Sequence, residues 1–575
     1  MLKIERTKNF VGMGEGLKRG EYFFGDGLKR TINGIIPAWE IREAINSGNL
    51  SDLLLIGFFT QIKLGNNNYI YAVNRTTSAS NGKIFSVLLG GSTFTLAHTP
   101  TTVSYGNGLI TDQKNRLLYL QTQYLGMFDG TTWTDNWKDF GAGSLPSNDT
   151  LRPADLYEDW VVMGNGNKVA LLNITDDSFN ANALNFPSGC VVSAIKSNRT
   201  GVLIGLNLGN RSILALWDCS STRTIAPWLW LDGNILAITN YGNSWIVRVG
   251  NKFIITNGYS YQELPPIPGT SLDAYETGNP LPSAIAVKDH YLLVGVNAFG
   301  LGRRKAGLWI LDFNTQTWEF CHISNKCYYG VSMGGILVAG TSVYIGYATS
   351  DPSKYYIGRI YDVYSGGINS SAFVTYISPI MGEGDEEKIA VGALLNLGMY
   401  ASSVQSAFVT PNPNYTVDLK IYDFKRRLYN SWTTSATSPA LNQLKVDGSS
   451  RSSIAGQIEV GDEVTICSGA NAGEIRHITA IQNRGTANEI WVLDSNLPSL
   501  TASNVQLEIC PFKKAATQTL NTYTINDFYF NIPHSPQGKK FLLKVVITFP
   551  SGLGVVYIPE ITGLALVYDV LSRYF

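Results

Sequence analysis

The chain has 575 residues, in which 44 Lys and Arg are balanced by 44 Asp and Glu, and only 15% of its residues are charged. This length exceeds what one hydrophobic core serves, so two or three domains are expected. A net charge of zero excludes proteins that find nucleic acid or an anionic membrane through a strong overall field. The low charge and the 30 Tyr and 57 Gly indicate a chain that hides much of its surface in contacts.

The first ten residues contain no apolar segment of the kind that directs secretion, and no apolar run approaches the ~20 residues of a membrane span. We therefore expect a protein that is neither secreted by this route nor embedded in a membrane. Six cysteines are too few for a disulfide scaffold in so long a chain. Zinc bound by Cys321, His322 and Cys327 is an alternative, but no second ligand pair has metal-site spacing, and we expect no metal or cofactor.

The N-terminal segment, residues 1–49, contains one basic hexapeptide twice, as GEGLKR at 14–19 and GDGLKR at 25–30. Glycines and Lys-Arg pairs can cradle a phosphate, but the strand and helix that flank a nucleotide-binding loop are missing. We therefore predict an irregular arm that lies on another surface, with phosphate binding as the alternative. A short helix is predicted at 38–45, closed by Asn46-Ser47-Gly48. The predicted contact residues of the arm are Lys18, Arg19, Tyr22, Phe23, Phe24, Lys29 and Arg30.

From residue 50 onward, short strands rich in β-branched and aromatic residues alternate with turns, which predicts an all-β protein. A period of ~40 to 50 residues with about four strands per unit indicates a β-propeller. Extending the repeat back to the strand at 83–88 adds a seventh unit, so residues 50–380 are predicted to form a roughly seven-bladed propeller. The repeat consists of strands that end in an Asp or Asn turn, at intervals of 44, 45, 39, 55 and 50 residues: Asp129, Asn173, Asp218, Asn257, Asp312 and Asp362.

After residue 380 the strands become longer and alternate between apolar and polar side chains, as at 415–422 and 540–549. Strands of this length predict a β-sandwich formed by residues 381–452 and 513–575. The hairpin at 460–481 and the two short strands that follow it predict a small β-barrel at 453–512, inserted into the sandwich.

Groups that could carry out catalysis do not converge in this sequence. The five histidines fall in different predicted blades or domains, and no nucleophile motif or sialidase-type Asp box is present. The acidic run 383–387 is better explained as a solvated interdomain turn than as a cation site. The basic trio 425–427 is better explained as a surface ion pair or a solvated strand end than as a nucleic-acid site. We therefore expect a protein that is not an enzyme.

A glycine-rich N-terminal segment, a propeller of about seven units, the strand at 376–380, a charged turn and a sandwich follow one another in this order. This order resembles the tail nozzle proteins of short-tailed bacteriophages. The resemblance implies a structural virion protein, made in the host cytoplasm, that forms a homo-oligomeric and commonly hexameric ring. In such a ring the N-terminal arm would serve assembly by reaching a neighbouring subunit or the ring above. It also implies contacts with tail adaptor or portal-proximal proteins and tail fibres, while genomic DNA passes through the channel without sequence recognition. A propeller that binds or hydrolyses glycans, as a host-surface adhesin, remains the alternative.

Overall fold

The structure is a computed structural model, and the account below is confined to the parts of the chain that it describes. These are residues 2–7, 12–13, 21–22, 24–26, 28–30, 35–37, 39–43, 56–75, 82–91, 93–102, 105–147, 150–220, 222–250, 252–267, 281–297, 307–321, 332–348, 355–362, 373–382, 386–401, 414–426, 430–449, 458–467, 469–471, 474–521, 526–532, 536–548 and 557–570. All of the regular elements in these stretches are β-strands, and none of the stretches forms a helix able to cross a membrane.

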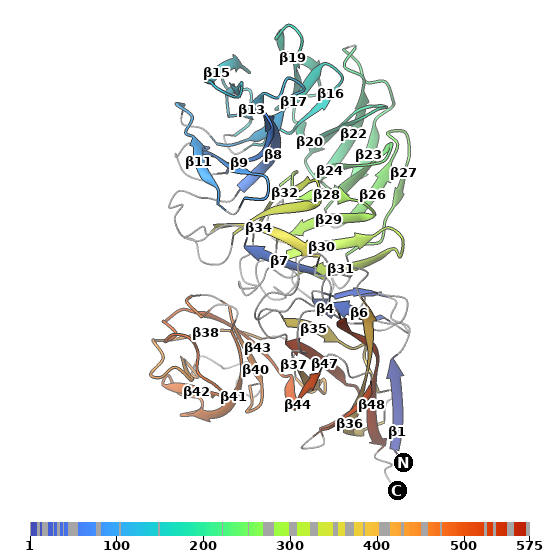
Figure 1. Ribbon diagram of the computed structural model, residues 1–575, viewed down its shortest axis with the longest axis vertical. Helices are drawn as coiled ribbons and strands as arrows, with labels where there is room; N and C mark the ends of the chain where they lie inside the picture. The colour runs from blue at the N-terminus through green and yellow to red at the C-terminus, as the bar shows by residue number, and fades with distance from the viewer. Residues whose placement is uncertain are drawn as a thin grey trace.

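Seven antiparallel sheets of four strands make up the blades of a β-propeller in this part of the chain, in the upper half of Figure 1. Blade 1 contains β8 (Ile56–Leu64), β9 (Asn67–Asn74), β10 (Ile84–Leu88) and β11 (Thr95–His98); blade 2 contains β12 (Gly108–Thr111), β13 (Leu117–Leu120), β14 (Tyr124–Phe128) and β15 (Trp133–Asp139). Blade 3 contains β16 (Ala154–Tyr157), β17 (Trp160–Asn165), β18 (Lys168–Asn173) and β19 (Phe179–Asn185); blade 4 contains β20 (Val191–Asn198), β21 (Gly201–Leu208), β22 (Arg211–Trp217) and β23 (Leu229–Asp232). Blade 5 contains β24 (Ile235–Tyr241), β25 (Ser244–Val249), β26 (Lys252–Thr256) and β27 (Tyr261–Glu263); blade 6 contains β28 (Ile285–Lys288), β29 (Tyr291–Val296), β30 (Gly307–Asp312) and β31 (Thr317–Cys321). Blade 7 contains β32 (Ser332–Ala339), β33 (Ser342–Ala348), β34 (Tyr355–Asp362) and, from the N-terminal segment, β7 (Trp39–Glu43).

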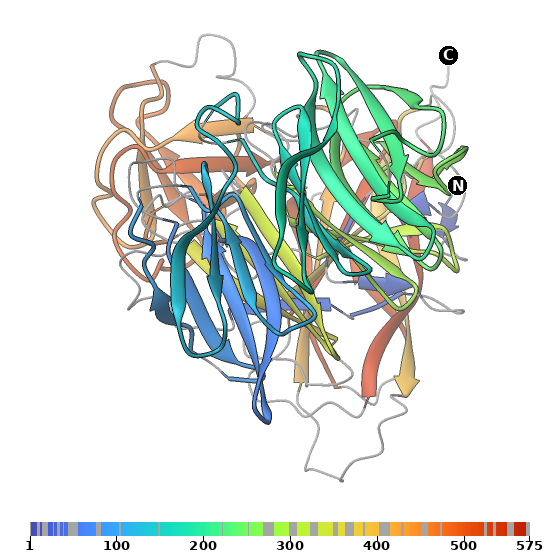
Figure 2. The ribbon, with the colours of Figure 1, turned by 90° about the horizontal axis from the view of Figure 1, so that it is seen from above.

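The blades stack in a closed ring because each of them buries its apolar faces only against its neighbours. The first strand of every blade packs against the first strand of the next, and β32 of blade 7 packs against β8 of blade 1. The middle strands are buried almost along their whole length, as in β21 and β29. Figure 2 views the molecule from the propeller end, with the early blades in blue and the middle blades in green on opposite sides.

Strand β7 closes the ring, and the short helix predicted at 38–45 is wrong. Asp362 pairs with Trp39, Ile360 with Ile41 and Gly358 with Glu43, and blue β7 lies beside yellow β34 in Figure 1. The sequence Trp-Glu-Ile-Arg-Glu also alternates with a period of two, which suits a strand. A helix of eight residues is marginal on its own, whereas the edge of β34 offers a complete ladder of hydrogen bonds.

The repeated Asp and Asn residues begin the turn between the third and fourth strands in blades 2 to 6. The Oδ1 atom of Asp129 accepts hydrogen bonds from the N–H groups of Thr131 and Thr132. Asn257 accepts from Tyr259 and Ser260 in the same way. The corresponding bonds of the other three blades are donated to Asn173, Asp218 and Asp312. The period used to predict the propeller therefore reflects a side chain that fixes its own turn locally.

A second repeat lies at the end of the second strand, where YAVN, VVMGN, LIGLN and LVGVN each place an Asn after an apolar run. Oδ1 of Asn207 accepts from the N–H of Ile235, and its Nδ2 donates to the carbonyl of Ile235, at 2.8 and 3.0 Å. Oδ1 of Asn297 accepts from the N–H of Met333 at 2.6 Å. All three bonds tie one blade to the first strand of the next, so these amides help to set the spacing of the ring.

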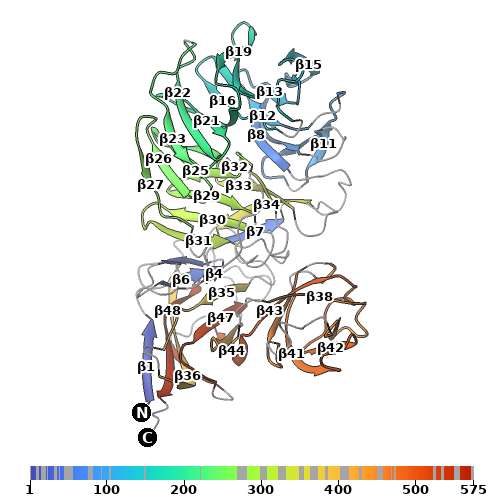
Figure 3. The ribbon, with the colours of Figure 1, turned by 180° about the vertical axis from the view of Figure 1, so that it is seen from behind.

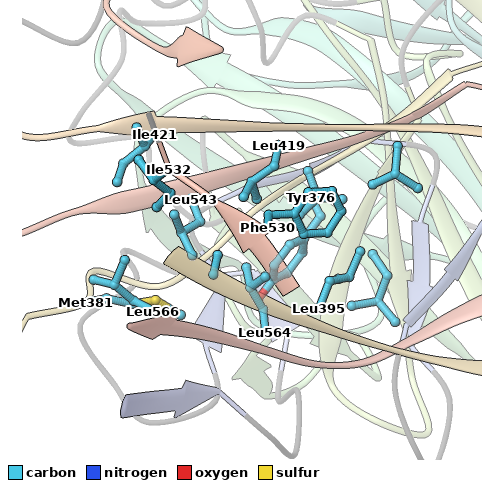
Figure 4. Close-up of a cluster of buried hydrophobic side chains, with 14 of the residues drawn as sticks. Tyr376, Met381, Leu395, Leu419, Ile421, Phe530, Ile532, Leu543, Leu564 and Leu566 are labelled. Atoms are coloured by element: carbon cyan, nitrogen blue, oxygen red, sulfur yellow. The ribbon is translucent and has the colours of Figure 1, made fainter. Parts of the chain in front are cut away.

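A β-sandwich follows the propeller, at the lower right of Figure 1. Its seven-stranded sheet contains β45 (Asn526–Asn531), β36 (Lys388–Ala401), β48 (Tyr557–Val570), β6 (Ile35–Pro37) and β5 (Leu28–Arg30), with β1 (Leu2–Thr7) beside β48 and β46 (Gln537–Gly538) beside β36. Its five-stranded sheet contains β4 (Phe24–Asp26), β35 (Phe373–Ile377), β47 (Leu542–Thr548), β37 (Asn414–Tyr422) and β44 (Lys513–Asn521). Figure 4 shows the core between them, where Leu395 and Phe530 of one sheet meet Leu419 and Leu543 of the other. Because β35 belongs to this sandwich, β34 is the last strand of the propeller in chain order, and the propeller ends before the predicted boundary at 380.

Parts of the predicted irregular arm are strands of the sandwich. Strand β4 pairs with β35, β5 pairs with β6, and the side chain of Leu28 is buried in the sandwich core. A further short pair is parallel, between β2 (Gly12–Met13) and β3 (Glu21–Tyr22). The prediction of an irregular arm is therefore wrong for these stretches, because β4, β5 and β6 extend the sheets of the sandwich, while β2 and β3 pair with each other.

A small barrel interrupts the sandwich between β37 and β44. It contains β38 (Asn430–Thr433), β39 (Gln443–Val446), β40 (Glu463–Ile466), β41 (Ile475–Gln482), β42 (Glu489–Leu493) and β43 (Gln506–Cys510). The strand order is β38-β43-β40-β41-β42-β39, and a bridge between Thr434 and Val446 brings its two ends together around buried Trp491. The insertion thus begins near residue 430 and not at 453, because closure needs β38 and β39, which cover two edges that four strands would leave open.

Candidate functional site

The propeller, the sandwich and the barrel share one buried apolar cluster. Trp309 and Trp318 of blade 6 lie in it together with Tyr422 of the sandwich and Phe512, which follows the last barrel strand. The indole N–H of Trp318 donates to the carbonyl of Pro265 at 2.9 Å. We call this region the junction. Its other buried members are Ala237, Ile246, Phe253, Ile267, Ile285, Leu292, Val294, Val296, Leu311, Phe320, Ile377, Cys510 and Leu542.

A buried set of charges joins the sandwich to the barrel at the junction. Lys420 of β37 and Lys544 of β47 are directly paired across the sandwich sheet. Nζ of Lys420 lies 2.5 Å from Oε2 of Glu463 in β40, and Nζ of Lys544 lies 2.7 Å from its Oε1. The side chains of Lys420 and Lys544 are 5% and 3% exposed, and that of Glu463 is 0% exposed. Two lysines from one domain therefore clamp a carboxylate from another, away from water.

A second ion-pair group lies next to this clamp. The guanidinium of Arg426 donates to both carboxylate oxygens of Asp462 at 2.6 Å, a bidentate geometry. Burial would lower the pKa of Arg426, but the contacts with Asp462 and Glu459 outweigh burial and raise it. Lys513 of the sandwich donates to Glu459 at 3.0 Å. These pairs continue the line of contacts along the boundary between sandwich and barrel.

Tyr422 connects the apolar and the charged parts of the junction. Its hydroxyl donates to the carbonyl of Arg426 at 2.5 Å, and its ring lies 5.8 Å from the ring of Phe512. Burial, followed by the charge of Asp423, raises the pKa of the Tyr422 hydroxyl to about 12. The hydroxyl therefore stays protonated and keeps donating at neutral pH.

The contacts at the junction hold the three β-units together. Its ions are paired within the protein, and removing one partner would leave another charge buried and uncompensated. In the described residues there is no group of three His, Cys, Asp or Glu side chains that could hold a metal ion. Cys321, considered above as a zinc ligand, is buried in the core between blades 6 and 7, while His322 and Cys327 lie outside the described residues.

Two histidines are hydrogen-bonded to carboxylates away from the junction. His98 lies 2.9 Å from Asp135, which also accepts a bond from the hydroxyl of Tyr119, and its ring stacks on Trp133 at 4.2 Å. This set ties β11 of blade 1 to β15 of blade 2. His477 pairs with Asp494 within the barrel at 3.2 Å.

The residues predicted for the arm are not gathered at the junction. Lys18, Arg19 and Phe23 lie outside the described residues. Tyr22 lies in β3, Phe24 in β4, and Lys29 and Arg30 in β5. Lys420, Glu463 and Lys544 were not among the residues predicted from the sequence. The signal that could have found them is a charged residue among the apolar residues of a strand, as in DLKIY, DEVTI and LLKVVI.

No family model matches the chain, and no curated protein sequence matches it. Among solved structures it is similar to BBS1N in complex with ARL6DN, with a TM-score of 0.39 and 8% identity, over 56% of this chain and 95% of that chain. It is also similar to the extracellular domain of BT4673 from B. thetaiotaomicron, with a TM-score of 0.39 and 10% identity, over 79% of this chain and 47% of that chain. A third similarity is to the extracellular domain of BT3049 from B. thetaiotaomicron, with a TM-score of 0.37 and 11% identity, over 70% of this chain and 55% of that chain. At these values the assignment of a propeller rests on the sheets described above.

Proposed function

We propose that this protein is a structural subunit of a bacteriophage tail, and that it forms the nozzle ring at the end of the DNA-ejection channel. The observation that carries the proposal is the junction, where three β-units are held together by one apolar core and by buried ion pairs. A part of a channel wall must keep its shape under load, and such a junction makes the three units one body. The order of the units, which resembles that of tail nozzle proteins, supports the choice of this assembly.

The proposal includes the partners of the ring. Adaptor or portal-proximal proteins lie above it, tail fibres contact it, and DNA passes through without base recognition. A chain with no net charge suits this role, because a strongly basic wall would hold phosphates and slow the passage of DNA. The proposal also places the protein in the virion and gives it no enzymatic activity.

Electron microscopy and quantitative mass spectrometry of purified virions test this proposal. We expect the chain in a fixed small number of copies per particle, six for a hexameric ring, and density for a seven-bladed propeller at the tail. Absence of the protein from purified virions would reject the role.

One observation favours a second candidate, a glycan-binding propeller. Trp230, Tyr259 and Tyr261, on or beside the outer strands of blades 4 and 5, are 54%, 55% and 48% exposed. Exposed rings present an apolar face and a polar edge, which suits an amphipathic ligand such as a sugar. Binding to a glycan array that is lost on Trp230→Ala or Tyr261→Ala would support this candidate, and an array without binding would remove it.

A further inference from the structure

Two strands of the seven-stranded sandwich sheet, β1 and β45, lie at edges of the sheet, and each has one partner in the described part of the chain. Strand β1 pairs with β48, and β45 pairs with β36. Each of the two is six residues long. Figure 3 shows β1 at the outer margin of the sandwich. A strand at a sheet edge presents a row of N–H and C=O groups that another strand can pair with.

The register of the four strands places one row of side chains on the outer face of this sheet. Arg6 pairs with Ala565, Ala565 with Leu394, and Leu394 with Tyr529. The residues that follow the last two, Leu395 and Phe530, point the other way, into the sandwich core. The row therefore faces away from the core, as does the adjacent pair of Ile4 and Val567, two residues along.

Apart from Arg6, the outer face is apolar over these pairs, and its large exposed apolar side chains lie at its two edges. Val567 and Ala565 in the middle are only 7% and 1% exposed, whereas Ile4 on β1 is 54% exposed and Tyr529 on β45 is 52% exposed. A Cβ added at Gly392 would meet the Tyr529 hydroxyl oxygen, which shows that this ring lies across β36. Each edge thus carries an uncovered apolar side chain on the same face.

Strand direction allows the two edges to join. The pairs β1 with β48, β48 with β36, and β36 with β45 are all antiparallel, so β1 and β45 run in opposite directions. If β45 of a second copy lay beside β1, the new pair would be antiparallel like the rest of the sheet. The outer faces would coincide, and Ile4 would pack near Tyr529 of the second copy.

Charge favours this head-to-tail arrangement over two identical edges meeting. Strand β1 carries exposed Lys3 and Arg6, while the carboxylate of Glu5 accepts a bond from the N–H of Gly382. Strand β45 has the sequence NDFYFN, with Asp527 and no basic residue. Two β1 edges would oppose like charges, and so would two β45 edges, whereas β1 beside β45 opposes unlike ones.

We propose that copies of this chain join edge to edge, with β45 of one copy extending the seven-stranded sheet beside β1 of the next. Such a contact is heterologous, and it produces a ring when its rotation closes. The proposal rests on the proposed function, because it names the surface through which the ring forms.

Cysteine cross-linking on the full chain tests the contact. Ile4→Cys and Tyr529→Cys in one protein should give a ladder of disulfide-linked multimers under mild oxidation, ending at the size of the ring, while either change alone gives none. The parent protein, with its native cysteines, is the background control. Dimers from a single variant would overturn the head-to-tail arrangement in favour of a two-fold contact.

Native mass measurements separate this inference from the proposed function. Tyr529→Lys should lower the fraction of assembled rings at least tenfold, and Tyr259→Lys, an equally exposed tyrosine on the propeller, should not. Intact rings with Tyr529→Lys and no ladder would overturn the contact while leaving the ring role in place. If the parent protein is present in virions as a monomer and not as a ring, both the edge contact and the proposed function are rejected.

Discussion

At the scale of single residues, Glu463 is the carboxylate that both buried lysines of the junction share. Replacing it with Gln keeps the shape of the side chain but leaves Lys420 and Lys544 without their counter-charge in a site that excludes water. We expect Glu463→Gln to lower the free energy of unfolding by about 3 to 5 kcal/mol, the cost of breaking a buried pair from one side. Chemical denaturation measures the change. Glu263→Gln, in an exposed pair with Lys252, is the matched control and should have little effect; equal losses in both variants would contradict the assignment.

The ionised carboxylate of Asp494 makes the stability of the barrel depend on pH in the acid range. Burial alone would raise the pKa of its carboxyl, but the contacts with His477 and Arg476 outweigh burial and lower the pKa to about 2. Because this lies below the ordinary value of ~3.9 for an unfolded chain, the stabilisation is complete above pH ~4 and is lost as the pH falls towards 2. We expect Asp494→Asn to lower Tm at neutral pH and to flatten the fall of Tm between pH 4 and 2. The control is Asp232→Asn, at a fully exposed site; a parental slope in Asp494→Asn would show that another group is responsible.

At the scale of elements, β7 is the strand on which closure of the ring depends. Ile41 lies in the middle of β7 opposite Ile360, and a proline there removes an N–H from the ladder. We expect Ile41→Pro to speed hydrogen exchange of the β34 amides by about tenfold, which corresponds to the loss of one or two net hydrogen bonds. Ile4→Pro, in strand β1 of the sandwich, is the control and should leave β34 protected. Unchanged exchange in Ile41→Pro would mean that blade 7 is held without its fourth strand.

At the scale of the whole molecule, the junction should make the three β-units unfold together. Phe512 is completely buried between the barrel, the sandwich and blade 6, so Phe512→Ala removes packing that all three share. We expect one calorimetric transition for the parent protein and separate transitions for Phe512→Ala, with a loss of about 3 to 5 kcal/mol. Leu118→Ala, a core change between blades 2 and 3, should lower Tm without splitting the transition. A split transition in the parent protein would show that the junction does not couple the units.

The sequence by itself determined the features that depend on neighbouring residues. Strand composition predicted an all-β chain. The repeated Asx turns at Asp129, Asn257 and their equivalents, extended back to the strand at 83–88, predicted about seven blades, because each side chain bonds to the backbone two or three residues away. The longer strands after residue 380 likewise predicted a sandwich with an inserted barrel.

Only the tertiary structure decided which distant segments meet. The pattern at 39–43 suits a helix or a strand, and the edge of β34, more than 300 residues away, selected the strand. Lys420 and Lys544 stand 43 and 81 residues from Glu463, so no local pattern shows that they share a carboxylate. The first two barrel strands are four residues each and were missed for the same reason. Local hydrogen bonds leave a signature in adjacent residues, whereas long-range pairing and buried charge depend on surfaces that exist only after the chain has folded.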